Sequence, residues 1–221
     1  MSPEPVTFYF DFISPYAYLA WTQIHETCRR HGRGVEAIPI LFAALLDANK
    51  TKGPAEIPSK RIYVFKDTLR HAHALGVDFK PPPTHPFNPL LGLRIASIEM
   101  GADEQKRAID ALYRATWAGG PGITDPEAVA TVLNDAGLDG ASLVAQAGSQ
   151  AIKDRVKLQT QAALERGVFG VPTMIVDGEL FWGLDAFGHV ERRLRGEDPV
   201  TAELWATFRD VQASSTRPGS R

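Results

Sequence analysis

The residues with the clearest chemical potential lie near the amino terminus, where Ser14-Pro15 interrupts an aromatic run at residues 8–18. Ser is preferred immediately before a helix, and Pro fits the first helical position because its missing N–H would be unpaired there anyway. The hydroxyl of Ser14 is therefore expected at the amino-terminal end of a helix. Unpaired N–H groups and the helix dipole favour an anion at that point. The sequence predicts an anion site at Ser14, and the identity of the anion decides the function.

Other reactive patterns are weak in this sequence. Ser14 would need a general base to act as a nucleophile, and no Gly-x-Ser-x-Gly elbow suggests one. Cys28, the single cysteine, lies farther along the same predicted helix, roughly 20 Å from Ser14 at ~1.5 Å per residue, so it cannot serve this site. His71 and His73 are two residues apart on a predicted helix and point to different faces. We expect no metal site.

Composition excludes several classes of protein. The chain has 221 residues, 44% of them hydrophobic, which is enough for a substantial core. A net charge of −2 gives no electrostatic footprint for nucleic acid or an anionic membrane. No apolar run approaches the ~20 residues that span a bilayer, and no secretory signal is visible. A single cysteine forms no internal disulfide, so we expect a cytoplasmic protein.

The elements that must position Ser14 alternate between strand and helix. Residues 6–12 read as a buried strand. The following helix carries a core-facing stripe that includes Ala17, Trp21 and Ile24, and it ends near residue 31. Residues 35–41 form a second strand. A unit of this size predicts two parallel strands joined by a right-handed crossover.

A long helical block follows. Helices are predicted at 59–75, 90–100, 103–117, 124–136 and 140–147, and nothing from 45 to 147 alternates like a strand. In the first of these helices, apolar residues recur at intervals of three or four residues: Ile62, Phe65, Leu69 and Ala72. The proline-rich residues 80–89 predict a rigid loop that could rim a pocket.

Strand patterns then return. A helix at 149–166 precedes strands at 173–176 and 179–182, which flank the hairpin signal Asp177-Gly178. Helices at 186–194 and about 198–211 complete the pattern. The predicted fold class is α/β, a thioredoxin-like domain (1–44 and 149–213) interrupted by an all-helical insertion domain (45–148). We expect residues 214–221 to be a disordered tail.

Two motifs carry a family resemblance. The start Ser14-Pro-Tyr-Ala17, together with Gly167-Val-Phe-Gly-Val-Pro-Thr173 before the hairpin, resembles the thioredoxin superfamily, and the helical insertion resembles disulfide oxidoreductases of the periplasmic type. Those enzymes carry Cys-x-x-Cys where this chain has Ser14 and Ala17, so dithiol chemistry is absent. Both motifs closely resemble the corresponding motifs of 2-hydroxychromene-2-carboxylate isomerases and kappa-class glutathione transferases. The order of elements fits up to about residue 196.

The resemblance implies glutathione as cofactor. In that family the serine at the helix start donates a hydrogen bond to the glutathione sulfur and holds it as a thiolate. This is physically reasonable, because a free thiol with a pKa of about 8.5 is mostly protonated at neutral pH, and a helix amino terminus lowers that pKa. Ser14 is then the catalytic residue, acting as a donor to sulfur.

The resemblance also assigns cofactor-binding residues. Val171 would offer backbone groups to the glutathione peptide, Pro172 would follow a cis bond, Leu184 would contribute backbone, and Asp185 would hold the γ-glutamyl amino group. The alternatives are a trans proline at a strand start and an ordinary helix-capping aspartate. The family often shows Gly-Asn/Ser-Asp-Arg where this chain has Gly183-Leu-Asp-Ala186.

Substrate-binding residues are predicted in the loop after the second strand. Asn49 matches an asparagine that reaches the thiol and substrate region, and it could equally be a turn asparagine. Lys50 could supply charge for a carboxylate-bearing substrate, as could Lys60, with a hydroxyl from Tyr63. Most exposed lysines, however, do not bind a substrate.

The sequence therefore predicts a glutathione-dependent isomerase of the 2-hydroxychromene-2-carboxylate type, acting on a small aromatic carboxylate in aromatic compound degradation. The family chemistry opens a cyclic hemiketal to a trans-benzylidenepyruvate acid. Two alternatives stay open: a kappa-like transferase that conjugates glutathione to electrophiles, and a thioredoxin-like binding module without catalysis. The resemblance also implies a homodimer.

Overall fold

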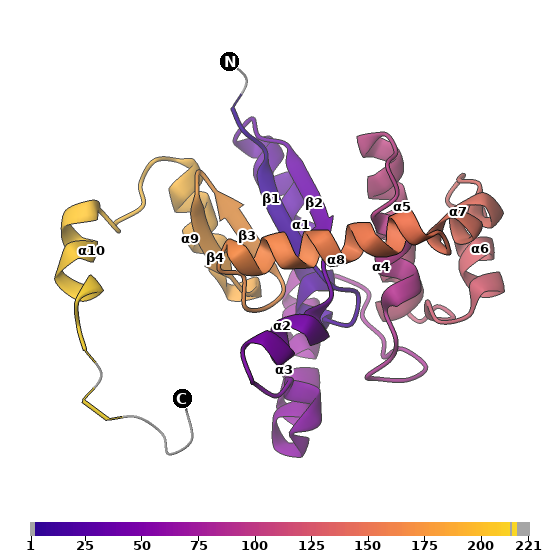
Figure 1. Ribbon diagram of the computed structural model, residues 1–221, viewed down its shortest axis with the longest axis horizontal. Helices are drawn as coiled ribbons and strands as arrows, with labels where there is room; N and C mark the ends of the chain where they lie inside the picture. The colour runs from indigo at the N-terminus through magenta and orange to yellow at the C-terminus, as the bar shows by residue number, and fades with distance from the viewer. Residues whose placement is uncertain (1–2, 213, 216–221) are drawn as a thin grey trace.

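A computed structural model describes residues 3–212 and 214–215. Its sheet has the order β2-β1-β3-β4, with β1 parallel to β2 and antiparallel to β3, and with β4 antiparallel to β3 (Figure 1). The four strands are β1 (Val6–Phe10), β2 (Val35–Pro39), β3 (Thr173–Val176) and β4 (Glu179–Trp182). The predicted parallel unit and the predicted hairpin are both confirmed.

Side chains of β1 alternate between two cores, as the pleat of a strand requires. Phe8 and Phe10 enter the larger core, with α1 (Pro15–Arg30) and α9 (Phe187–Leu194). The buried stripe of α1 is confirmed. Tyr9 points the other way, into a smaller core with side chains of two other helices. These are α2 (Phe42–Ala48) and α8 (Gln150–Glu165), the latter crossing in front of the sheet in Figure 1.

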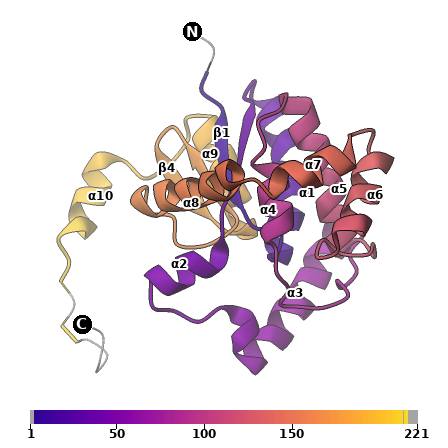
Figure 2. The same ribbon diagram turned by 45° about the vertical axis from the view of Figure 1, so that its right-hand side comes forward.

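The segment between β2 and β3 is helical, as predicted. Between the 3₁₀ turn η1 (Pro54–Glu56), which follows α2, and helix α8 come five further helices, of which α4 to α7 gather beside the sheet (Figure 2). They are α3 (Pro58–Leu75), α4 (Leu90–Ala96), α5 (Ala102–Trp117), α6 (Pro126–Asp135) and α7 (Gly140–Ala147). The indole of Trp117 donates a 2.8 Å hydrogen bond to the carbonyl of Phe12, which ties this insertion to the end of β1.

Two parts of the helical region differ from the predicted pattern. Helix α2 was not predicted, and it spans the proposed domain boundary at residue 45, so that boundary stays a prediction. The apolar residues of α3 do not form one core-facing stripe. Ala72 is buried, whereas Ile62 is 59% exposed and Leu69 is 53% exposed. The predicted end of α3 is confirmed, because Gly76 adopts a left-handed φ of 64° there.

The carboxyl-terminal elements begin later than predicted. A 3₁₀ turn, η2 (Leu184–Ala186), precedes α9, and the last helix, α10 (Ala202–Arg209), is capped by Thr201. Helix α10 lies apart from the rest of the protein in Figure 1. Most of the tail predicted to be disordered, and residue 213, lie outside the described residues. No described helix is long and apolar enough to cross a bilayer.

Candidate functional site

Ser14 is the amino-terminal cap of α1, as predicted. Its Oγ accepts the N–H of Ala17 at 3.2 Å and donates to the carbonyl of Val171 over 3.4 Å. The first turn of α1 contains no acidic side chain, and among the described residues the N–H of Tyr16 has no acceptor. A long hydrogen bond is weak, so the hydroxyl proton is available to an anion placed at this helix end.

Asp11 fixes the loop that presents Ser14. Its two carboxylate oxygens accept the N–H of Ile13 at 3.0 Å and the N–H of Phe42 at 2.9 Å. The side chain is completely buried, and this burial raises the pKa of Asp11 to about 7 although the two N–H donors lower it. The sequence alone does not decide the role of Asp11, which stands inside an aromatic run. The structure shows that it joins the β1–α1 loop to the start of α2.

The proline-rich loop supports the same segment from the insertion. The Nε2 of His85 lies 3.1 Å from the carbonyl of Ile13, so this nitrogen carries the proton in that bond. Burial lowers the pKa of His85, which favours the neutral ring. The ring packs edge-on against Phe65 and Phe87. The loop predicted to rim a pocket therefore holds the residue that precedes Ser14.

The Val171–Pro172 bond is cis, as the resemblance implied. The carbonyl of Val171 faces the hydroxyl of Ser14, and the N–H of Val171 has no acceptor among the described residues. An extended peptide can pair with such backbone groups as another strand would. The carbonyl of Pro172 accepts the N–H of Gly183 at 3.0 Å, which joins this loop to the one that carries Asp185.

Asp185 does not cap a helix, so the alternative interpretation as an ordinary capping aspartate does not apply. It lies within η2, its side chain is exposed, and no hydrogen bond or ion pair to another described residue involves it. Gly183, with φ of 95°, permits this placement, because a Cβ there would lie 2.5 Å from the Oδ1 of Asp185. Leu184 between them is buried. A free carboxylate therefore faces solvent beside the loop of Pro172.

Tyr16, in the first turn of the Ser14 helix, is tied to α3 and senses the charge of Asp185. The Tyr16 hydroxyl donates to Asp67 on α3 at 2.8 Å. Burial and this hydrogen bond raise the pKa of Tyr16, and the charge of Asp185 adds to the effect. Sequence reasoning missed Tyr16 and Asp67. The one sequence signal for a role of Tyr16 is its position within the Ser-Pro-Tyr-Ala motif.

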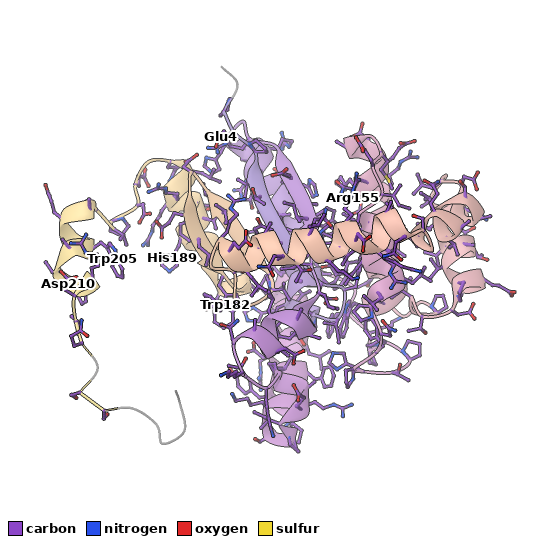
Figure 3. All side chains as sticks on the ribbon, viewed as in Figure 1. Glu4, Arg155, Trp182, His189, Trp205 and Asp210 are labelled. Atoms are coloured by element: carbon purple, nitrogen blue, oxygen red, sulfur yellow. The ribbon has the colours of Figure 1, made fainter. Side chains whose placement is uncertain are left out.

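Two exposed aromatic residues also flank the Pro172 loop. Phe169 and Trp182 have ring centroids 5.2 Å apart, although both are about half exposed. The indole lies against Gly170, where a Cβ would come within 2.5 Å of Nε1. Figure 3 shows Trp182 at the end of β4, on the side of the sheet where α2 and α3 lie. Sequence reasoning missed this pair, since pairing across the loop is not visible in a linear pattern.

The predicted substrate residues are less closely tied to Ser14. The Asn49 amide donates to the carbonyl of Leu45 at 2.8 Å, so it caps the end of α2. Lys50 follows with a left-handed φ of 51° and is exposed. No hydrogen bond or ion pair among the described residues joins either side chain to Ser14 or Asp185. Their role in substrate binding stays a prediction.

The arrangement suits a small peptide thiol. Ser14 and the amino terminus of α1 offer donors for a sulfur anion, Val171 offers an unpaired N–H, and Asp185 offers a free carboxylate for an ammonium group. Glutathione carries these three partners: a thiol, peptide bonds and a γ-glutamyl amino group. No histidine or carboxylate among the described residues hydrogen-bonds the Ser14 hydroxyl, so the geometry does not favour a serine nucleophile.

Comparison with known proteins shows which proteins this chain is similar to. Residues 5–195 match the model of the DSBA-like thioredoxin domain family. A 2-hydroxychromene-2-carboxylate isomerase from Sphingobium xenophagum is 31% identical over 193 residues, covering 86% of this chain and 98% of that protein. Glutathione S-transferase kappa 2 from Caenorhabditis elegans is 30% identical over 183 residues, covering 78% of this chain and 81% of that protein.

A solved structure agrees with the fold. The structure of a selenomethionine form of 2-hydroxychromene-2-carboxylate isomerase superposes with a TM-score of 0.80 at 25% identity, covering 94% of this chain and 99% of that chain. The likeness thus extends over nearly the whole chain.

Proposed function

Because the chain belongs to the DSBA-like thioredoxin domain family, together with the 2-hydroxychromene-2-carboxylate isomerases and the kappa-class glutathione transferases, we propose that it is a glutathione-dependent isomerase. The proposed substrate is a small aromatic carboxylate of the 2-hydroxychromene-2-carboxylate type, converted in the breakdown of aromatic compounds. The relatives named for this isomerase support the proposal over most of the chain.

One observation carries the proposal: a serine hydroxyl, rather than a cysteine, caps α1 and faces the carbonyl of Val171. A site of this kind stabilises a thiolate that another molecule brings. When bound, glutathione supplies a thiolate that adds reversibly to a conjugated carbon, so that the bond beside it can rotate before elimination. The chain's own residues hold that thiolate at Ser14, the peptide at Val171 and the amino group at Asp185. No net oxidation occurs, which agrees with the absence of a second cysteine.

The proposal is tested by titrating the protein with glutathione at neutral pH and following the ultraviolet absorbance of the thiolate. We expect an absorbance that rises and saturates with one glutathione per chain, because the helix end and the Ser14 hydroxyl lower the thiol pKa. S-methylglutathione is the control, since it has the same peptide but no ionisable thiol. The absence of both binding and thiolate would favour the binding module without catalysis.

A second candidate function is the conjugation of glutathione to electrophiles, favoured by the likeness to glutathione S-transferase kappa 2. The same thiolate site serves both reactions, and they differ in the fate of glutathione. An isomerase returns it unchanged, whereas a transferase consumes one molecule per turnover. Counting free thiol during turnover with an aromatic electrophile separates the two.

Asp185→Asn is expected to raise the Kd for glutathione about tenfold, because the variant loses its charge opposite the γ-glutamyl ammonium group. Charge-assisted hydrogen bonds contribute about 1.5–3 kcal/mol, and the exposure of Asp185 to solvent places this one at the low end. The absorbance of the thiolate at saturating glutathione should change little, since the sulfur is held elsewhere. Isothermal titration measures the Kd. Asp103→Asn, at an exposed position of α5, is the matched control. An unchanged Kd in Asp185→Asn would contradict the assignment.

The proposal includes a cytoplasmic location and a homodimer. The single cysteine, Cys28, is free and forms no disulfide within the chain, which is consistent with a reducing compartment. Exposed apolar side chains on α3, among them Ile62 and Leu69, offer a surface for a second copy. Neither nucleic acid nor a membrane is proposed as a partner.

Leu69→Glu is expected to convert the dimer to a monomer, because it places a charge in the apolar face of α3. Light scattering after size-exclusion chromatography measures the mass. Leu158→Glu is the matched control, since Leu158 on α8 is 70% exposed and should not affect the assembly. A wild-type protein that is monomeric at every concentration would rule out the dimer.

A further inference from the structure

A groove separate from the Ser14 site lies between α8, α4 and the start of α2. Its volume is about 470 Å³, within the range of pockets that bind small molecules. Side chains of Leu41, Leu90 and Leu164 form apolar walls. Figure 2 shows α8 in front, with α2 and α4 beside it. The groove therefore lies where the helical insertion meets the sheet-containing part of the chain, a frequent position for ligand sites.

The charges on this groove have one sign. Arg94, Lys153 and Lys157 line it, and no acidic residue does. Asp154 lies 3.5 Å from Lys157, but Arg94 and Lys153 form no ion pair with another described residue. Both are half-buried, with less contact with water than a fully exposed cation. Cations without a partner beside apolar walls complement a ligand that is both anionic and apolar.

The groove shares no lining residue with the candidate glutathione site. Its nearest link is Leu41, whose N–H is accepted by the hydroxyl of Thr160 at 3.0 Å. The next residue, Phe42, donates to Asp11, which holds the Ser14 loop. Two consecutive backbone N–H groups, those of Leu41 and Phe42, thus connect the lining of the groove to the loop that carries Ser14. A ligand in the groove would contact neither Ser14 nor Asp185.

We propose that this groove is a second binding site, for a small organic anion with an apolar ring system. The carboxylate or sulfonate of such a ligand would lie between Arg94 and Lys153, and its rings would contact the leucine walls. The proposal does not depend on the glutathione reaction, because it uses different residues and a different ligand chemistry.

The test uses 2-naphthoate and its neutral counterpart 2-naphthamide, with the affinity of each measured by isothermal titration. We expect 2-naphthoate to bind about tenfold more tightly, a difference of about 1.4 kcal/mol. The double variant Arg94→Gln/Lys153→Gln should bind both compounds with similar, weak affinity. Arg70→Gln/Arg192→Gln is the matched control, because it removes the same charge from exposed positions on α3 and α9. Circular dichroism checks that both variants fold.

Two further measurements test where 2-naphthoate binds: its affinity in the presence of glutathione and its affinity for the Ser14→Ala variant. We expect neither glutathione nor the substitution to change the affinity for 2-naphthoate. Displacement of 2-naphthoate by glutathione would place it in the Ser14 site and overturn the proposal, as would equal affinity in the wild type and in Arg94→Gln/Lys153→Gln. Loss of binding at higher protein concentration, with a matching increase in mass by light scattering, would show that a second copy fills the groove, and would also overturn it.

Discussion

Ser14→Ala is expected to abolish the thiolate absorbance of bound glutathione at neutral pH and to reduce the isomerase rate by about 10²–10³. The variant loses the hydroxyl donor to sulfur, and removing one donor of this kind from a site that stabilises an anion costs about that factor. Glutathione should still bind, because Val171 and Asp185 are unchanged. Absorbance titration and isothermal titration on the same samples separate the loss of ionisation from the loss of binding.

Ser149→Ala is the matched control for this variant. Ser149 also caps a helix of 16 residues, α8, where its hydroxyl accepts the N–H of Ile152 at 3.4 Å. Each substitution removes a capping hydroxyl and should cost about 1 kcal/mol of stability. Only Ser14→Ala should affect the thiolate. A full thiolate signal in Ser14→Ala would show that the helix end alone ionises the thiol.

Asp11→Asn is expected to change how stability depends on pH. In wild type the carboxyl of Asp11 titrates at about pH 7 when folded, against 3.8 for the ordinary side chain. The folded protein therefore keeps a proton that the unfolded chain releases between those values, and stability falls as pH rises through this window. The difference corresponds to about 4 kcal/mol, at 1.36 kcal/mol per pKa unit. The side chain of Asn cannot ionise, so the stability of the variant does not fall for this reason as pH rises.

Urea unfolding of both proteins at pH about 5 and about 8 measures the effect. The wild type should lose stability relative to Asp11→Asn as pH rises, because other titrating groups are common to both proteins and cancel in the comparison. The variant is also expected to be less stable than wild type at the lower pH. Both oxygens of the protonated carboxyl still have lone pairs for the N–H groups of Ile13 and Phe42, whereas the NH₂ group of Asn accepts no hydrogen bond. Parallel pH profiles would contradict the burial argument.

Local sequence patterns predicted most of the fold. The bounds of β3, β4 and α7 agree with the predicted ranges, because a hairpin signal and short apolar runs determine them locally. Helix α2 was missed because it has no side-chain cap, and contacts of Leu45 with the smaller core stabilise it. The exposure of Ile62 and Leu69 on α3 could not be predicted, because an apolar pattern does not show whether the rest of the chain covers those side chains.

The candidate site was predictable only in part. Ser14 and Val171 stand in recognisable motifs, yet the 3.4 Å contact between them joins residues 157 positions apart. The pairing of Tyr16 with Asp67 and the contact of His85 with Ile13 depend on where the insertion packs, which no local pattern records. Asp185 was placed by resemblance, and its freedom from any capping bond follows from its position inside the 3₁₀ turn η2, where Gly183 holds the cap position.

Conversion of 2-hydroxychromene-2-carboxylate to its trans-benzylidenepyruvate isomer, with and without glutathione, tests the central claim most directly. The account predicts that the protein accelerates the approach to equilibrium only when glutathione is present, and that free thiol is fully recovered afterwards. Equal rates without glutathione, or no acceleration at any glutathione concentration, would contradict it.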